Sequence, residues 1–360
     1  MFLKFFWNIT RIVCILTLIS YCFGYFLKPE HWLVGFILLG IQICIGLCFG
    51  LTLIWFFNSK LRAFYPLGVL LLGFPFLSRT VQFHKPKPIG NIHDFSMLSY
   101  NVSGFYSNEY YKNKDEAKTL KAIHFAADFD ADIKCFQDFY NWDETPITGS
   151  IKRISKKNSP HFVAAKPREL STANQGMIGL VVFSKYPLIY RKQKMFATPG
   201  NGILVADMVF KKDTFRIINT QLQSTGARVN KVLKKDYDLV KKEGRNLITN
   251  LKIGFKERIA QVKLLEEWII ESPYPVILAG DFNEVPYGLA YGKVAKYLDN
   301  SFEKAGYGFG FTLNRSPRFV RIDNQFYGKG LIVNSFETLF EVENSDHYPL
   351  YGEYSLVKKQ

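Results

Sequence analysis

The stretch that decides the fold lies at residues 276–286 and reads Val-Ile-Leu-Ala-Gly-Asp-Phe-Asn-Glu-Val-Pro. Its first four residues are apolar and two of them are β-branched, so they predict a short buried strand that ends at Gly280. Asp281 and Asn283 follow the strand directly. Either residue alone is common in a turn, because its side chain hydrogen-bonds the nearby backbone. Their meaning therefore depends on whether other segments carry similar groups.

Three further segments end an apolar run in polar groups that could face a cation or a phosphate. They are 98–102 with Asn101, 135–138 with Asp138, and 344–349 with Asp346 and His347. Several carboxylates brought to one place repel one another and require a cation. Oxygen donors without thiols suit a hard ion such as Mg²⁺ or Mn²⁺, which would neutralise a phosphate. These segments predict metal-dependent phosphate chemistry.

Short runs of β-branched and aromatic residues alternate with a few helical patterns in the rest of the chain. We expect strands at 95–102, 132–136, 177–183, 203–210, 214–220, 276–279, 320–326 and 349–354. We expect helices at 115–129, within 229–251, and at 257–271. Many strands with few helices predict an α+β protein in which two sheets pack together with helices outside.

The N-terminal region, residues 1–83, is apolar and almost uncharged, which predicts a transmembrane region. Its three apolar runs cover 5–27, 32–57 and 64–77. The first two reach the roughly 20 apolar residues of a spanning helix, whereas the third is short and contains Pro66 and Pro75. We expect two to three transmembrane helices. They would form an anchor rather than a channel, because no acidic residue or histidine lies within a span.

Basic residues near the ends of these runs predict the orientation in the membrane. Lys4 and Arg11 favour a cytoplasmic N-terminus, and Lys60 with Arg62 before the third run favours the same side. Three crossings would place the large domain on the periplasmic side of the cytoplasmic (inner) membrane. Arg79 and the lysines that follow the third run pull the other way.

The remainder of the chain divides into a linker and one large domain. Residues 84–91 are rich in proline and predict a stiff linker, and 92–360 are long enough for a single core. The chain has 46 Lys and Arg against 31 Asp and Glu, a formal charge of +15 that suits anionic partners. Residues 228–258 are rich in lysine and arginine. We interpret them as a solvated helix face rather than a membrane-facing patch, because acidic residues interrupt the run.

The segments at 280–283 and 345–347 resemble the endonuclease/exonuclease/phosphatase superfamily, with supporting matches at 183–187 and 321–323 in the expected order. This superfamily includes DNase I-like nucleases, apurinic endonucleases, neutral sphingomyelinases and inositol-phosphate phosphatases. The resemblance covers nearly all of 92–356. It implies a four-layer αββα sandwich with divalent-metal phosphoesterase activity.

The resemblance also implies which residues bind the metal, Mg²⁺ or Mn²⁺, and the phosphate. Asp138 and Asp346 would bind the metal, and Asn101 would orient a metal ligand or the phosphate. Asn283 would hold the phosphate.

Proton transfer is implied for three further positions. Asp281 would orient or activate the attacking water, and Asp323 would orient the imidazole of His347. His347 would contact the phosphate and transfer a proton, since a carboxylate partner fixes the tautomer and raises the basicity of a histidine.

Three positions depart from the superfamily pattern. Asp138 stands where a glutamate is usual, Gln221 stands where a catalytic histidine is usual, and Asn324 follows Asp323 where tyrosine is frequent. A glutamine side chain cannot exchange a proton near neutral pH. Losing a general acid or base typically lowers the rate roughly a hundred- to ten-thousandfold.

The sequence therefore leaves two functions open. One is a membrane-anchored phosphoesterase that acts on a phospholipid, nucleic acid or sugar phosphate. The other is a pseudoenzyme that binds or scaffolds membrane-protein partners. Lipid-headgroup binding through the basic segment is a third, weaker hypothesis.

Overall fold

The computed structural model describes residues 2–28, 30–85, 93–166, 176–224, 237–316 and 318–357, with only the backbone described at residue 2 and at 237–243. Most of the expected Pro-rich linker at 84–91 lies outside these residues, and so does the first part of the basic segment at 228–258.

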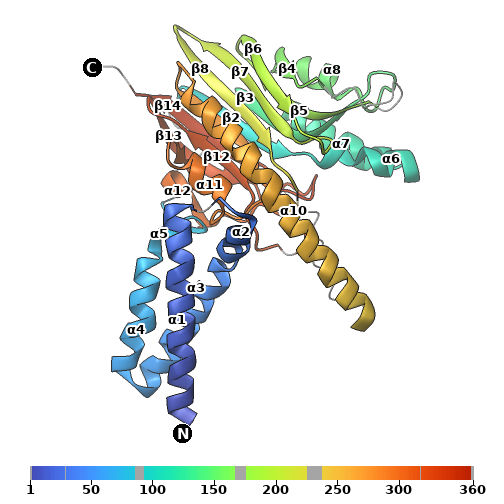
Figure 1. Cartoon of the computed structure of the whole chain (residues 1–360). Coiled ribbons are helices and arrows are strands. Elements are labelled where there is room, and N and C mark those ends of the chain that lie inside the picture. Colours follow the sequence, from blue (N-terminus) through green and yellow to red (C-terminus); the bar gives the residue numbers. More distant parts are fainter. Residues whose placement is uncertain are drawn as a thin grey trace.

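Two six-stranded sheets form the centre of the domain (Figure 1). The first has the order β13-β14-β2-β3-β5-β4 and the second β10-β12-β9-β8-β7-β6. Only two neighbouring pairs among the described strands are parallel, β2 with β3 and β8 with β9. The first sheet contains β2 (Phe95–Asn101), β3 (Ile133–Asn141), β4 (His161–Ala164), β5 (Met177–Ser184), β13 (Leu331–Thr338) and β14 (Leu350–Leu356). The second contains β6 (Leu188–Met195), β7 (Gly202–Phe210), β8 (Asp213–Gln221), β9 (Val276–Asp281), β10 (Asp299–Asn300) and β12 (Asp323–Tyr327).

Alternating side chains along each central strand build three apolar layers. In β2, Met97 lies between the sheets, whereas Leu98 lies against the outer helix of the first sheet. In β9, Ile277 faces the other sheet and Leu278 faces the outer helices of the second. This two-residue period is the geometry of an extended strand. Because both faces are covered, the central strands β5, β7 and β9 are nearly continuous apolar runs.

Helices cover the outside of both sheets and complete four layers. The first sheet is covered by α7 (Glu116–Asp128), which begins at Asp115, whose side chain accepts a hydrogen bond from the Lys118 amide. The second is covered by α10 (Tyr237–Ile270) and α11 (Leu289–Val294). The shorter elements are η1 (Ser103–Tyr106), α6 (Ser107–Asn113), α8 (Ser150–Ser155) and α12 (Ser301–Ala305). The predicted α+β, four-layer αββα sandwich is confirmed.

Differences from the predicted elements have simple physical reasons. The helices expected within 229–251 and at 257–271 are one helix of 34 residues, α10, because no proline interrupts the sequence between them. The sequence analysis did not predict β4, β6, β10 and β13. All four are edge strands, and β6 in particular exposes much of its length, so they lack the apolar signal of a buried strand.

The N-terminal region forms helices that project from one end of the sandwich (Figure 1). They are α1 (Phe2–Phe26), α2 (Trp32–Leu39), α3 (Ile41–Asn58), α4 (Lys60–Leu72) and α5 (Phe74–Leu77). Two stretches, Leu3–Phe26 and Trp32–Asn58, are long and apolar enough to cross a membrane by length and composition. The second is interrupted at Gly40, between α2 and α3. The third apolar run is the main part of α4 and α5, and α4 contains Pro66.

These helices join the domain beside the segment that follows β9. The strand β1 (Val81–Phe83) pairs with β11 (Tyr307–Phe309). The Thr80 hydroxyl lies 2.6 Å from the hydroxyl of Tyr287, and the Arg79 guanidinium donates to the Pro286 carbonyl at 3.0 Å. Tyr287 also belongs to the apolar cluster of the N-terminal helices. The polar segment after β9 therefore leads directly into the residues that contact the N-terminal helices.

Gly280 permits the close approach of β9 to β8 just before Asp281. It has φ 156°, and a Cβ atom there would lie 1.9 Å from the backbone oxygen of Thr220.

We predict that Gly280→Ala lowers the free energy of unfolding by about 3 kcal/mol, the scale of overpacking and backbone strain. Thermal unfolding of the full chain tests this prediction. Gly149→Ala is the matched control, because its Cβ would have its nearest neighbour at 3.6 Å. Equal melting temperatures for the two variants would contradict the prediction.

Candidate functional site

Strand register brings polar residues to one level at the end of the second sheet. Gln221 of β8 and Asp323 of β12 both pair with Asp281 of β9, one on each side. In the first sheet, Asn101 of β2 pairs with Gln137 of β3. Each of these residues lies at or near the end of its strand, and these strand ends lie at the same edge of the two sheets. Segments that are far apart in the sequence therefore meet there.

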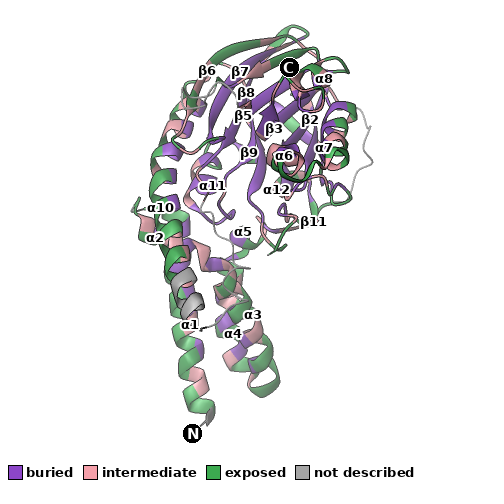
Figure 2. Cartoon of the chain, turned by 90° about the vertical axis from the view of Figure 1, so that its right-hand side faces the viewer, coloured by how far each residue is buried: buried purple, intermediate pink, exposed green. Residues whose placement is uncertain are grey.

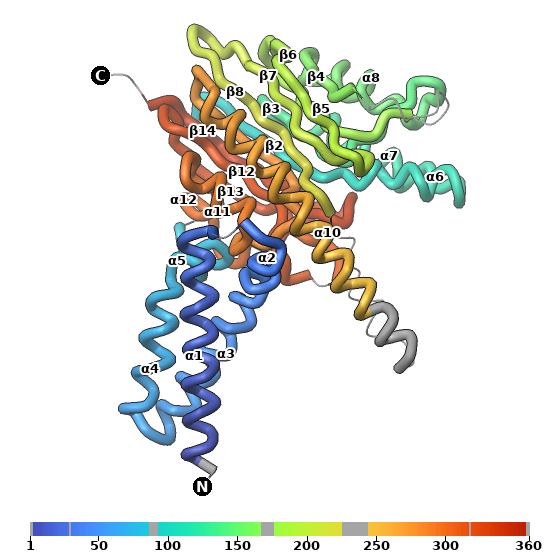
Figure 3. The backbone as a smooth tube through the Cα atoms, viewed as in Figure 1, coloured from blue at the N-terminus to red at the C-terminus, as the bar shows by residue number. Residues whose placement is uncertain are grey.

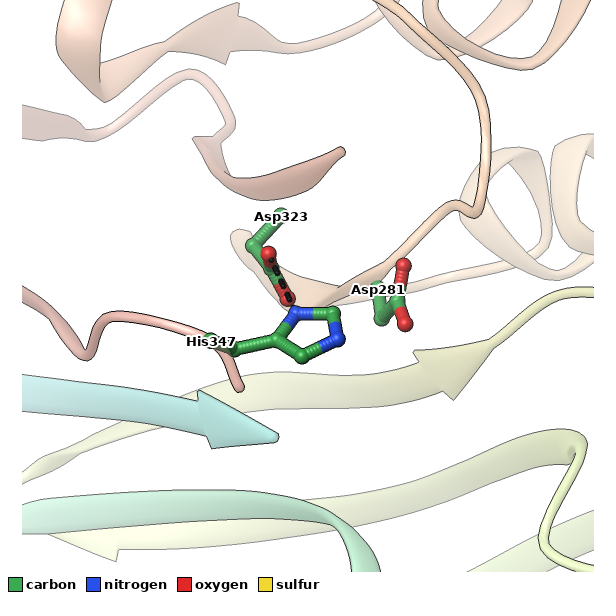
Figure 4. A group of neighbouring side chains, drawn as sticks. All are labelled: Asp281, Asp323 and His347. Carbon is green, nitrogen blue, oxygen red and sulfur yellow. Dashed lines mark hydrogen bonds and ion pairs between the residues drawn. The ribbon is translucent and has the colours of Figure 1, made fainter. Parts of the chain in front are cut away.

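Three buried side chains form the centre of the site (Figure 4). One ligand atom from each of Asp281, Asp323 and His347 lies within 4.8 Å of the other two. His347 Nδ1 is 2.9 Å from Asp323 Oδ2. His347 precedes β14 of the first sheet and Asp323 begins β12 of the second, so this ion pair connects the two sheets.

The surrounding carboxylates favour the protonated form of His347. Burial of the imidazole lowers its pKa, but the negative charges of Asp323, Asp281 and Asp346 outweigh burial and raise the pKa to about 10. A protonated imidazole bonded to Asp323 donates hydrogen bonds and cannot act as a metal ligand.

Asp281 is held by the two asparagines that the sequence predicts to be functional. Its Oδ1 accepts from the Asn283 amide at 2.7 Å, and its Oδ2 accepts from the side-chain nitrogens of Asn283 and Asn101, both at 3.1 Å. Burial and the neighbouring charge of Asp323 raise the pKa of Asp281 to about 7, against the opposing effect of His347. Asn283 has φ 48°, a conformation that asparagine tolerates better than most residues.

The two predicted metal ligands, Asp138 and Asp346, lie beside this centre. Asp138 lies within the bulge of β3 between Phe136 and Phe139, and its amide donates to Oε1 of Gln221 at 2.9 Å. Burial raises the pKa of its carboxyl, which hydrogen bonds from Gln221 and Asn101 oppose. Asp346 Oδ1 lies 4.0 Å from His347 Nε2. Burial raises the pKa of Asp346, but His347 and Arg315 outweigh burial and lower it.

All seven residues predicted from the sequence therefore belong to one group. We call this group, with Gln221 added, the inter-sheet cluster. Its members are Asn101, Asp138, Gln221, Asp281, Asn283, Asp323, Asp346 and His347. Their contacts link the first sheet to the second repeatedly, and Gln221, which departs from the superfamily pattern, supports the backbone of Asp138.

Sequence reasoning missed a second layer of polar residues beneath the cluster. Gln137 donates to the side-chain oxygen of buried Asn219 at 2.7 Å, and Asn219 donates to the carbonyls of Phe136 and Val181 at 2.9 and 3.1 Å. These bonds also cross between the sheets. The available signal was an asparagine directly after the apolar pair Ile217 and Ile218 of a strand, because a buried amide requires partners. The Nε atom of Arg315 lies 3.2 Å from Oδ2 of Asp346, and no local sequence pattern predicted this contact.

The donor set fits a hard divalent cation. Carboxylate oxygens predominate and no thiol takes part, which suits Mg²⁺ or Mn²⁺. The Oδ1 atom of Asp323 is buried without a hydrogen-bond partner in the described structure. The raised pKa values of Asp281 and Asp138 reflect negative charges packed together at low solvent exposure, which a cation would relieve.

The pKa of His347 predicts a pH-dependent contribution to stability. Its value rises from 6.5 to about 10 on folding, so the charged pair with Asp323 stabilises the protein fully below pH 6.5 and loses this effect toward pH 10. We expect His347→Gln to destabilise the metal-free protein most near pH 6, and less as the pH approaches 10. Denaturant unfolding at a series of pH values measures this difference, with exposed His124→Gln as the control. A cost that stays constant with pH would contradict the assignment.

Comparisons with known proteins agree with this architecture. Residues 98–347 match the Endonuclease/Exonuclease/phosphatase family, and residues 3–80 match a domain of unknown function, DUF8431. No curated protein matches the chain. The crystal structure of an endonuclease/exonuclease/phosphatase from Beutenbergia cavernae has 15% identity and a TM-score of 0.50, with 74% of this chain and 72% of that chain covered.

Two further solved structures are similar at lower TM-scores. A family protein from Bacteroides thetaiotaomicron has 16% identity and a TM-score of 0.49, with 73% of this chain and 98% of that chain covered. The human Nocturnin catalytic domain with bound sulfate anion has 16% identity and a TM-score of 0.45, with coverage of 74% and 94%. The family match extends over more than half of the residues, from β2 to His347. The chain therefore belongs to the endonuclease/exonuclease/phosphatase family.

Proposed function

We propose that this protein is a membrane-anchored phosphoesterase that requires a divalent cation, Mg²⁺ or Mn²⁺, and hydrolyses a phosphodiester or phosphomonoester. The observation that carries the proposal is the buried His347–Asp323 pair beside Asp281, within the fold of this family. A charged imidazole next to a carboxylate of raised pKa supplies both a proton donor and a proton acceptor.

Each residue of the cluster has a chemical task in this proposal. Asp281, whose pKa is about 7 in the absence of a cation, orients or activates the attacking water. Protonated His347 donates to a phosphate oxygen, and Asp323 keeps its ring oriented. The side-chain amides of Asn283 and Asn101 hold Asp281 in place and supply further polar contacts.

The cation belongs beside the carboxylates rather than on the imidazole. Asp138, Asp346 and Asp281 would hold it, because His347 is protonated and bonded to Asp323. When bound, a divalent cation would neutralise the phosphate and stabilise the charge that develops during hydrolysis.

The N-terminal helices support anchoring in the cytoplasmic membrane. Much of their surface is exposed, as the green ribbon in Figure 2 shows. The exposed residues include large apolar ones, with Phe57 83% exposed and Leu61 84% exposed. Such surface suits lipid rather than water. The helices α1, α3 and α4 pack together, so α4 would provide the third crossing. With Lys4 and Arg11 in the cytoplasm, the domain would face the periplasm.

The substrate class follows only in part from these features. A cation flanked by amides and an imidazole recognises a phosphate group, which a phospholipid, a nucleic acid and a sugar phosphate share. The segment after Asn283 continues into Val285 and Tyr287, which pack with the N-terminal helices. This continuity favours a substrate presented near the membrane.

A second function, a catalytically degenerate binding subunit of a membrane complex, is favoured by Gln221. Its side-chain oxygen accepts the Asp138 amide, so the glutamine has a structural contact at the position where a catalytic histidine is usual. In this case the cluster would bind a phosphate-bearing or membrane-protein partner without turnover.

Cation binding and hydrolysis test the proposal together. We predict that the full chain binds Mn²⁺ in isothermal titration calorimetry, and that Asp346→Ala weakens binding at least about tenfold, since a charged ligand is removed. We also predict that His347→Gln lowers hydrolysis of bis(p-nitrophenyl) phosphate or p-nitrophenyl phosphate by about a hundredfold or more, because it removes the proton donor. His124→Gln, on an exposed helix face, should change neither. Absence of cation binding at millimolar concentration would instead support the pseudoenzyme.

The Gln221→His substitution tests whether the protein lacks only a proton-transfer residue or lacks a working active site. If only proton transfer is missing, the variant should hydrolyse the generic phosphodiester roughly a hundred- to ten-thousandfold faster. Gln221→Asn is the control, because it changes the side chain without adding a titratable group. Cation binding without any gain from histidine would show that the proton at this position does not limit the rate.

A further inference from the structure

The long helix α10 continues past the sandwich on the side where the N-terminal helices project (Figures 1 and 3). Its second half packs on the second sheet through residues such as Val262 and Leu265. Residues 244–253, which we call the α10 arm, contain no buried side chain. The arm extends from the packed half of the helix, and its apolar side chains would be exposed to water unless another surface covers them.

The arm is amphipathic, and its apolar stripe faces the anchor. Leu247, Leu251 and Phe255 recur every four residues and share one face, with Ile248 beside them. Phe255 packs edge-on against Phe36 of α2, with ring centroids 5.1 Å apart. The face that carries the stripe is therefore continuous with the contact between α10 and the second candidate span.

Ile248, beside the stripe, is 58% exposed, and Ile253 on the opposite side of the helix is 49% exposed. The charged side chains of the arm, Arg245 and Lys252, are both basic and both exposed. The Lys252 ammonium lies 4.5 Å from the ring centre of Trp32, which begins the second candidate span. Tryptophan at a span end and a basic flank beside an apolar stripe are both typical of the membrane–water interface.

We propose that the α10 arm is an interfacial helix that lies in the surface of an anionic bilayer, with its apolar stripe in the lipid and Arg245 and Lys252 on phosphate-bearing headgroups. This inference rests on the membrane anchoring proposed above. It revises the solvated-face interpretation of the basic segment, because the described part carries a partly exposed apolar stripe as well as charge. The arm would fix the tilt of the domain and hold the inter-sheet cluster at a set height above the lipid.

Hydrogen–deuterium exchange of the full chain, one copy per nanodisc, tests the inference. We expect the amides of residues 244–253 to exchange at least tenfold more slowly in phosphatidylglycerol nanodiscs than in phosphatidylcholine nanodiscs. The double variant Arg245→Glu and Lys252→Glu should abolish this difference. Lys212→Glu, an exposed lysine in the turn between β7 and β8, is the matched control and should retain it.

Separate readouts distinguish the possible failures. Fast exchange in the arm in both lipids, with α1 and α3 protected, would overturn the inference while leaving the anchoring intact. Unprotected α1 and α3 would overturn the anchoring and the inference together. Protection of the arm only when copies are concentrated in detergent, with no dependence on lipid charge, would assign the stripe to a second copy of the chain and also overturn the inference.

Discussion

The structure depends on a group of buried charges placed where two sheets meet. His347 and Asp323 form an ion pair that joins the first sheet to the second, and Asp281 lies against both. Burying charges is unfavourable unless each has a partner of opposite sign or a hydrogen bond. The asparagines on Asp281 and the raised pKa of His347 meet this requirement in part. The remaining excess of carboxylates would favour a bound cation.

Connectivity explains why the site and the N-terminal helices belong to one unit. After Asn283 the chain runs within a few residues into Tyr287, whose hydroxyl contacts Thr80 at the end of the N-terminal helices. The buried guanidinium of Arg321, just before Asp323, donates to the Arg79 carbonyl and to Asn300. Two segments of the cluster are therefore tied to the same joint. Movement of the domain relative to the helices would disturb the cluster, so a firm attachment preserves its geometry.

The sequence predicted the centre of the fold and the site because both leave strong local signals. Asp281 and Asp138 follow apolar runs, and strand ends of this kind meet when the strands share a sheet. The edge strand β6 was not predicted, since it is exposed or half-buried along its whole length and shows no alternation of apolar and polar residues. The pairing of Gln137 with Asn219 depends on how the two sheets face each other, which no local pattern records. The same holds for the contact of Gln221 with Asp138, where comparison with the superfamily indicated only a departure.

The central claim is that the inter-sheet cluster binds a divalent cation next to a phosphate. Electron paramagnetic resonance of Mn²⁺ with the full chain in detergent, in the presence of inorganic phosphate, tests it most directly. The account predicts a bound Mn²⁺ signal with hyperfine coupling to phosphorus, which Asp281→Asn removes or strongly weakens. A spectrum of free aqueous Mn²⁺ at millimolar concentration, or a bound signal that Asp281→Asn leaves unchanged, would contradict it.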